Sequence, residues 1–231
     1  MAIISVSGIT KVYNHSAVPV YALSGVSLDI ARGEFTAIVG PSGSGKTTLL
    51  NVIGGLDVPT EGTVVIDGVD ISRMKTDELI DFRLHHVGFV FQAYNLIPVL
   101  TASENVEFIM LLQGIPKADR EARTRELLQA VGLADRAHNR PSELSGGQQQ
   151  RVAVARALAS HPSFVLADEP TANLDSQSAM ALLDLMEHLN HDLAMTFLFS
   201  THDPRVIQHA HRIVTLEDGR IKADIANTPL R

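Results

Sequence analysis

The chain has 231 residues, of which 45% are hydrophobic and 5% aromatic, and 19 Lys and Arg against 26 Asp and Glu give a net charge of −7. This composition is typical of a soluble globular protein, and without a Lys/Arg block it does not support nucleic-acid binding. With no cysteine, the chain has no disulfide, no catalytic thiolate and no Cys-ligated zinc.

The first residues, from Met1 to Val6, lack the basic and long apolar regions of a signal peptide. No stretch approaches the roughly 18 uninterrupted apolar residues of a membrane-spanning helix. We therefore expect a cytoplasmic chain without a membrane span of its own.

Short apolar runs along the chain predict strands. They are Ile3–Ser7, Phe35–Val39, Val64–Ile66, Val87–Phe91, Phe164–Ala167, Met195–Phe199 and Ile213–Leu216. The run Phe164–Ala167 and the residues Phe197–Phe199 are apolar on both faces, which is typical of buried parallel strands. Asp218-Gly219 predicts a hairpin turn into a strand over Arg220–Ile225.

Helical patterns lie between these runs. The predicted helices start at Lys46, run from the capping box at Thr101 toward Leu112, span Lys117–Val131 with a stop at Gly132, and span Ser176–Asn190 behind the cap Asp175. Residues from about 95 to 160 read as mostly helical. We expect an α/β fold forming one domain over 1–231, in which a helical part (about 95–160, with the LSGGQ segment described below) interrupts a nucleotide-binding core (1–94 and 161–231).

A phosphate-binding loop follows the strand Phe35–Val39. Its residues are Gly40, Pro41, Ser42, Gly43, Ser44, Gly45, Lys46 and Thr47, with Thr48 next, and they match G-x-x-x-x-G-K-[ST]. Glycines let backbone N–H groups converge on phosphate oxygens at a helix N-terminus. Lys46 is expected to reach the β- and γ-phosphates and Thr47 to bind Mg²⁺. The alternative is a plain Gly-rich turn.

Two carboxylates follow the apolar strand Phe164–Ala167. At such a position Asp168 can hold Mg²⁺ through water, and Glu169 is then free to orient or deprotonate the attacking water. An Asp-Glu pair after a strand is also found in solvated turns, so this interpretation depends on the phosphate-binding loop.

The segment Leu144-Ser145-Gly146-Gly147-Gln148 forms an S-x-x-Q capping box at the start of a helix. The plainest interpretation is a well-capped helix. Ser145 and the glycine N–H groups also make a second anion-binding helix end. Since one nucleotide hardly needs both ends from one copy, we expect a two-fold dimer, in which each ATP lies between the loop of one subunit and Ser145 of the other.

These motifs, in this order, resemble the nucleotide-binding subunit of an ATP-binding cassette (ABC) transporter over essentially the whole chain. The resemblance implies that LSGGQ (Ser145, Gly146, Gly147 and Gln148) is the signature that binds the partner's ATP, and that Asp175 belongs to the loop contacting the partner. It also implies that Gln92 contacts Mg²⁺ and that His202 touches the γ-phosphate.

The adenine is expected to stack on an aromatic residue near the N-terminus. The resemblance favours Tyr13, and Tyr21 is the rival. The apolar segment Tyr94–Leu100 follows Gln92 directly, where the family receives a helix of its membrane subunit. The resemblance thus implies transmembrane permease subunits docking near Gln92–Leu100, which would hold this subunit at the cytoplasmic face of the membrane. The alternative is that these apolar residues are core of the helical part.

Further segments narrow the resemblance to the branch for lipoprotein release, macrolide export and cell division. They are Val20–Leu23, Asn51–Asp57, Asn95–Pro98 and Leu166–Thr171. Ala172 departs from this branch, which usually has glycine there. The rival functions are a soluble ABC ATPase of DNA repair or translation, a regulatory ATP-binding module, and an unrelated kinase or GTPase, which has no use for LSGGQ.

Overall fold

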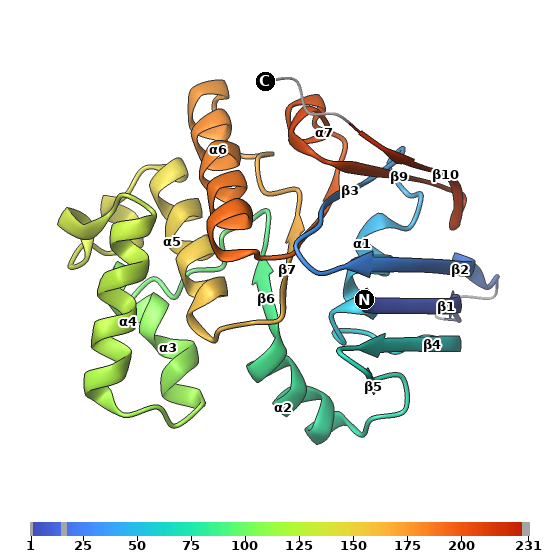
Figure 1. The fold of residues 1–231 in the computed structure, drawn as a ribbon, viewed down its shortest axis with the longest axis horizontal. Helices are drawn as coiled ribbons and strands as arrows, with labels where there is room; N and C mark the ends of the chain where they lie inside the picture. Colours follow the sequence, from blue (N-terminus) through green and yellow to red (C-terminus); the bar gives the residue numbers. More distant parts are fainter. Residues whose placement is uncertain (1, 15–17, 228–231) are drawn as a thin grey trace.

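The computed structural model describes residues 2–14 and 18–227, which form two β-sheets and a set of helices (Figure 1). The strands are β1 (Ala2–Tyr13), β2 (Val20–Ala31), β3 (Phe35–Val39), β4 (Glu61–Ile66), β5 (Val69–Asp70), β6 (Val87–Val90), β7 (Phe164–Asp168), β8 (Phe197–Thr201), β9 (Arg212–Glu217) and β10 (Arg220–Ala226). The α-helices are α1 (Lys46–Ile53), α2 (Thr76–His86), α3 (Ala102–Leu112), α4 (Lys117–Ala130), α5 (Gly146–Ala159), α6 (Ser176–Leu193) and α7 (Pro204–His209). Short 3₁₀ turns cover Ala134–Arg136 and Pro141–Glu143.

The larger sheet has the strand order β10-β9-β3-β8-β7-β6. Its strands are parallel from β9 to β6, and β10 pairs antiparallel with β9. Successive side chains of a strand point to opposite faces, and here both faces are covered. Phe197 and Phe199 therefore pack with the helices on one face, while Leu198 joins the core on the other.

The smaller sheet is antiparallel, in the order β2-β1-β4-β5. Helix α1 packs its apolar residues Leu49, Val52 and Ile53 into the core that both sheets share. The loop after β3 leads directly into α1, so this packing also fixes the position of the N-terminal end of α1, where the loop ends.

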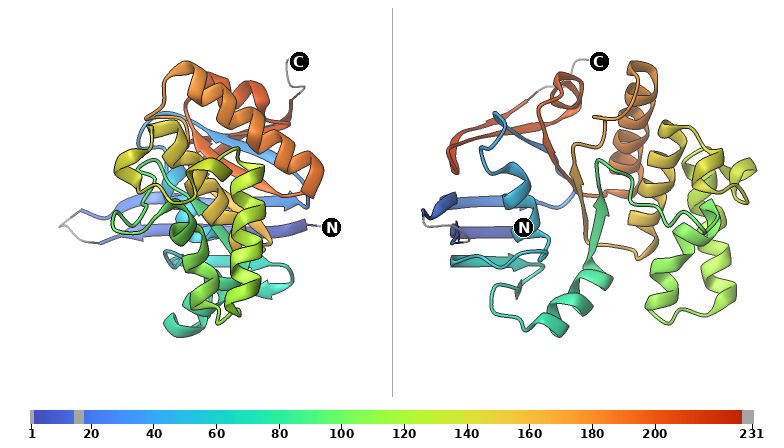
Figure 2. Two further views of the ribbon diagram at one scale, coloured as in Figure 1. Left: turned by 90° about the vertical axis from the view of Figure 1, so that its left-hand side faces the viewer. Right: turned by 180° about the vertical axis from the view of Figure 1, so that it is seen from behind.

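Helices α3, α4 and α5 lie together on the far side of β6 and β7 from the smaller sheet (Figures 1 and 2). A single apolar cluster joins these helices, α6 and one face of the larger sheet. Helix α5 lies so close to β6 that a Cβ added at Gly88 would be 2.6 Å from the carbonyl oxygen of Ala157. The helical part is thus packed directly against β6, which pairs with β7, the strand that ends in the acidic pair.

The α/β fold class predicted from the sequence is confirmed. Every predicted strand and helix is present, with ends shifted by a few residues; β8 begins at Phe197 rather than Met195 and ends at Thr201. The Asp218-Gly219 turn joins β9 and β10, and both residues have positive φ (48° and 70°) as such a turn requires. The sequence analysis did not predict β2, α2 or α7.

Candidate functional site

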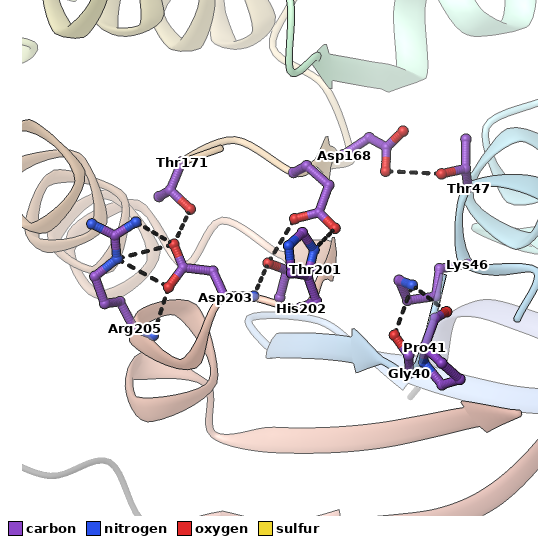
Figure 3. A network of polar contacts seen from close by, with 11 residues as sticks. Gly40, Pro41, Lys46, Thr47, Asp168, Thr171, Thr201, His202, Asp203 and Arg205 are labelled. Atoms are coloured by element: carbon purple, nitrogen blue, oxygen red, sulfur yellow. Dashed lines mark hydrogen bonds and ion pairs between the residues drawn. The ribbon is translucent and has the colours of Figure 1, made fainter. Parts of the chain in front are cut away.

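Three neighbouring parallel strands end at the same edge of the larger sheet and carry the predicted polar residues. The phosphate-binding loop follows β3, the acidic pair closes β7, and His202 follows β8. Figure 3 shows Lys46 and Thr47 on one side and Thr201, His202 and Asp203 on the other, with Asp168 between. Residues that are more than 120 positions apart in the sequence therefore share one site, since Thr47 bonds to Asp168.

The phosphate-binding loop depends on glycine at two positions. Gly40 and Gly45 have φ of 154° and 101°, and a Cβ would lie 2.0 Å from the Leu216 carbonyl oxygen at the first and 2.4 Å from that of Ala22 at the second. Gly45 is the N-cap of α1 and offers no side chain to the helix end. The N–H groups of the first turn therefore stay open to an anion.

Lys46 lies folded over the loop. Its Nζ donates hydrogen bonds to the carbonyl oxygens of Gly40 (2.9 Å) and Pro41 (3.0 Å), and the residue is only 8% exposed. Phosphate oxygens are stronger acceptors for an ammonium group than these carbonyls. The side chain is thus held within reach of the phosphates before nucleotide arrives.

The acidic pair is divided between two groups of partners. Asp168 Oδ1 accepts a hydrogen bond from the Thr47 hydroxyl at 3.2 Å. Glu169 Oε1 lies 2.6 Å from His202 Nδ1, and Oε2 accepts from the Thr201 hydroxyl at 3.1 Å. Glu169 has a φ of 46°, a left-handed conformation that costs free energy for a non-glycine residue and is commonly found at functional sites.

Asp203 forms a second network beside His202, and the sequence analysis did not include it. Its carboxylate accepts hydrogen bonds from the Arg205 guanidinium (2.7 and 3.0 Å) and the Thr171 hydroxyl (2.6 Å). Burial raises the pKa of Asp203, but the hydrogen bonds from Arg205 and Thr171 outweigh it and lower the pKa to about 2. The Asp-Pro pair at the start of α7 is a helix-start signal that would have indicated this residue.

A cavity of about 620 Å³ lies over these residues. Its lining comprises Val20, Tyr21, Ala22, Gly40, Pro41, Ser42, Gly43, Gly45, Lys46, Thr47, Thr48, Gln92, Glu169, Ala172 and His202. The structure thus brings the phosphate-binding loop, Gln92, Glu169 and His202 to one cavity. Ser44 and Asp168 are not part of this lining, although each is next to a lining residue in the chain.

The two tyrosines proposed for adenine differ in how they are held. Tyr13 donates a hydrogen bond from its hydroxyl to Asp57 (2.7 Å), and Lys11 Nζ lies 4.9 Å from the centre of its ring. Burial, followed by the bond to Asp57, raises the pKa of Tyr13. Tyr21 lines the cavity and is 62% exposed. The choice of Tyr13 stays a prediction.

The LSGGQ segment begins α5 as a capped helix. Ser145 Oγ accepts from the Gln148 N–H at 3.3 Å, and Gln148 Oε1 accepts from the Ser145 N–H at 2.9 Å. A Cβ at Gly147 would lie 3.0 Å from Ser178 Oγ, so this helix end faces the start of α6.

Asp175 caps α6 by accepting from the Ser178 N–H and hydroxyl. Ser145, Gly146, Gly147, Gln148 and Asp175 are all outside the lining of the cavity. A single copy of the chain therefore presents two separate helix ends, one at Gly45 inside the cavity lining and one at Ser145 outside it.

The helices formed by residues 2–14 and 18–227 include none with the length and hydrophobicity that crossing a membrane requires.

Comparison with known proteins gives a consistent result. Residues 23–172 match the family model described as ABC transporter. An ABC transporter ATP-binding protein of Thermotoga maritima is 50% identical, covering 92% of this chain and 90% of that protein. The ABC transporter ATP-binding protein YtrE of Bacillus subtilis is 47% identical, covering 94% and 93%.

Longer relatives and solved structures agree with this. The macrolide export ATP-binding/permease protein MacB of Burkholderia cenocepacia is 47% identical over 97% of this chain, which spans 33% of that protein's length. A solved structure of the ATP-binding cassette MJ0796, described as a dimeric post-hydrolysis state bound to ADP and Pi, has a TM-score of 0.89 and 42% identity. The match covers 98% of this chain and all of that one.

We predict that Asp203→Asn destabilises the fold by about 1–2 kcal/mol at neutral pH, because hydrogen bonds to a charged group are lost. The folded pKa of about 2 lies below the ordinary value near 3.9, so this stabilisation is present above about pH 4 and is lost as the pH falls through 2. Urea unfolding across this pH range measures it, with Asp192→Asn as the exposed control. A difference between parent and variant that did not shrink toward low pH would contradict the prediction.

Proposed function

Because the chain belongs to the ABC transporter family and is an ATPase of that family, we propose that it works as a head-to-tail homodimer that drives a separate membrane subunit. The observation that supports this is the cavity lined by the phosphate-binding loop, Gln92, Glu169 and His202, from which the second anion-binding helix end at Ser145 is excluded. We further propose that the nucleotide-binding core (1–94 and 161–231) and the helical part (about 95–160) form a single ABC ATPase domain.

The chain binds ATP, as its family does, and we propose that Lys46 and the N–H groups of residues 43–48 hold the phosphates. Thr47 would hold Mg²⁺ directly and Asp168 would hold it through water, since their side-chain oxygens lie 3.2 Å apart and such hard oxygen donors suit this ion. Gln92 lines the same cavity and would supply a further oxygen. Bound Mg²⁺ would neutralise charge on the β- and γ-phosphates.

Glu169 is the proposed base that orients the attacking water. Hydrogen bonds with Thr201 and His202 fix its carboxylate at the edge of the cavity, where it keeps acceptor capacity for a water proton. His202 Nδ1 is engaged by Glu169, so a contact with the γ-phosphate would use the other ring nitrogen, which can donate only when both ring nitrogens carry a proton. Lys46 and His202 then stabilise the negative charge that develops in the transition state.

A second copy of the chain would complete each site. In this arrangement Ser145 and Gly147 of one subunit meet the γ-phosphate held by the other, and Asp175 lies in the loop between subunits. The dimeric description of the MJ0796 cassette supports this assembly. Loss of the γ-phosphate would remove the bridging ligand and open the dimer.

The membrane subunit is proposed to dock beside Gln92–Leu100. A cavity of about 300 Å³ is lined there by residues of β6, of the segment after Gln92, of α3 and of α5. The buried side chain of Asn105 pins this segment by bonding to the main chain of Ile97, Leu100 and Thr101. Leu96 packs on the core, while Val99 is 73% exposed, so the segment contains both core and surface residues.

The finer proposal is that this subunit serves lipoprotein release, macrolide or peptide export, or a related transmission of force across the membrane. The identity with the ATP-binding part of MacB supports this branch. The chain would then be held at the cytoplasmic face of the membrane through its partner.

We expect Glu169→Gln to keep ATP binding and to lower turnover by roughly 10²- to 10⁴-fold, the usual contribution of a general base. The variant should accumulate as a dimer with Mg-ATP, because hydrolysis no longer opens it. Phosphate release and size-exclusion chromatography measure both effects, and Glu121→Gln on the exposed face of α4 is the control. Unchanged turnover would remove Glu169 from this role.

The membrane partner is tested with a tagged Glu169→Gln protein, trapped with Mg-ATP and recovered from detergent-solubilised membranes. We expect a membrane protein with few spans and a large extracytoplasmic domain. Adding Phe108→Glu, at the cavity proposed for docking, should abolish recovery of the membrane protein, because a charge would enter the apolar contact between the two proteins. Adding Leu193→Glu, at a residue that is 52% exposed on α6, should not. Recovery of soluble protein alone would favour the rival, a soluble ABC ATPase.

Stacking of adenine is expected on Tyr13, because the bond to Asp57 fixes this ring in advance. Tyr13→Ala should cost about 1–3 kcal/mol of ATP affinity, the usual range for base stacking, and Tyr13→Phe, which keeps the ring but loses the bond to Asp57, should fall between Tyr13→Ala and the parent. Titration with a fluorescent ATP analogue measures the affinities. If Tyr21→Ala gave the larger loss instead, adenine would be assigned to Tyr21.

A further inference from the structure

The loop that carries Gln92 is held through its main-chain carbonyl groups. Four of the five carbonyl oxygens from Phe91 to Asn95 accept hydrogen bonds from side chains of α5 or of the loop after β7. Gln150 Nε2 donates to Phe91 (3.4 Å), Asn173 Nδ2 to Gln92 (2.9 Å), and the Arg156 guanidinium to Tyr94 (2.9 Å) and Asn95 (2.5 Å). The loop is thus tied to the helix that begins at Ser145.

Arg156 makes the strongest part of this attachment. Its guanidinium is a rigid fork, and two of its N–H groups reach two consecutive carbonyl oxygens. Both hydrogen bonds go to neutral acceptors rather than to a carboxylate. Burial lowers the pKa of Arg156, and in this half-buried position the two carbonyl dipoles are the groups that stabilise its charge. Loss of the fork would therefore free the loop at its C-terminal half.

The backbone at this point needs support. Tyr94 and Asn95 have φ of 55° and 52°, and two consecutive non-glycine residues in the left-handed region are unfavourable without outside contacts. The carbonyl groups of these same two residues are the ones that Arg156 binds. The guanidinium thus stabilises a turn that the chain would not keep by itself.

Arg156 also contributes to the groove proposed for the membrane subunit. It lines that cavity together with Phe91, Asn95 and Phe108. The same side chain therefore lines the cavity proposed for docking and binds the loop whose residue Gln92 lines the nucleotide cavity.

We propose that Arg156 is a positioning residue that holds the loop Phe91–Asn95 in its left-handed turn and so places Gln92 in the nucleotide cavity. The loop and helix α5 then move together, and a change at the groove reaches Gln92 through Arg156. This proposal rests on the role given above to Gln92 as a contact to Mg²⁺. Arg156 does not itself touch nucleotide.

The test uses a spin label, because the chain has no cysteine and a single Ala93→Cys, at an exposed position of the loop, can be labelled alone. The labelled parent is first shown to retain ATPase activity. Arg156→Gln, Arg156→Lys and the control Arg125→Gln, which removes an exposed arginine of α4, are then compared with it. Electron paramagnetic resonance without nucleotide reports loop mobility, and the Mg²⁺ concentration at half-maximal ATPase rate reports the site.

We expect Arg156→Gln to raise label mobility clearly and to raise the half-maximal Mg²⁺ concentration by about tenfold or more, as changes behind a metal ligand commonly do. Arg156→Lys should fall between, since one ammonium replaces the fork, and Arg125→Gln should match the parent. Circular dichroism confirms folding, and Arg156→Lys, which keeps the buried stem, carries the test if Arg156→Gln does not fold.

Label mobility equal to the parent in the folded Arg156 variants would overturn the proposal. Raised mobility with an unchanged Mg²⁺ requirement would support the attachment by Arg156 but contradict the contact assigned to Gln92. An equal rise in Arg125→Gln would overturn the proposal, because it would show a general effect of lost charge rather than the loss of two specific hydrogen bonds.

Discussion

The alignment of β3, β8 and β7 is the constraint on which the site depends. These three strands are neighbours in one parallel sheet, so their carboxyl ends reach the same edge and deliver the phosphate-binding loop, His202 and Glu169 to one cavity. Their side chains are buried on both faces. A strand in this position cannot shift its register by one residue without moving apolar groups into the wrong core, and this fixes the spacing between Thr47, Asp168 and His202.

Hydrogen bonds also join the residues that follow the ends of these strands. The Thr201 hydroxyl donates to Glu169 and accepts from the Asp203 N–H (3.0 Å), and Asp203 in turn holds Arg205 and Thr171. One hydroxyl therefore joins the residue proposed to orient water to a network outside the cavity. The left-handed backbone of Glu169 is held within this arrangement, with its N–H bonded to the Ser200 carbonyl at 2.9 Å.

Much of the fold could be predicted because strong local patterns match it. The buried strands β3, β7 and β8 are mostly apolar, and the capping boxes at Thr101 and Ser145 both form. Helix α2 was missed because only Leu79 and Phe82 are buried along it, which leaves little helical periodicity. Strand β2 does show alternation, from Val26 to Ile30. The serine and glycine directly before this stretch interrupt the apolar pattern, and they made the strand hard to recognise.

The residues of the candidate site also fall into those that the sequence could predict and those that it could not. The motif residues predicted from spacing and from the family resemblance come together at one cavity, whereas partners such as Asp203 and Arg156 are set by tertiary contacts that leave only weak local signals. The placement of Tyr13 against Tyr21 depends on how the β1–β2 hairpin lies over the cavity, which spacing in the sequence does not determine.

Attachment through carbonyl groups has a consequence for how this surface can change during evolution. Every residue type supplies the same carbonyl oxygen, so the bonds from Arg156 and Asn173 to the loop place no demand on the exposed side chain of Ala93. Substitutions there can alter the face proposed to meet a membrane subunit while the position of Gln92 is kept. A duplicated gene could in this way acquire a new partner through a few loop mutations, with its nucleotide chemistry unchanged.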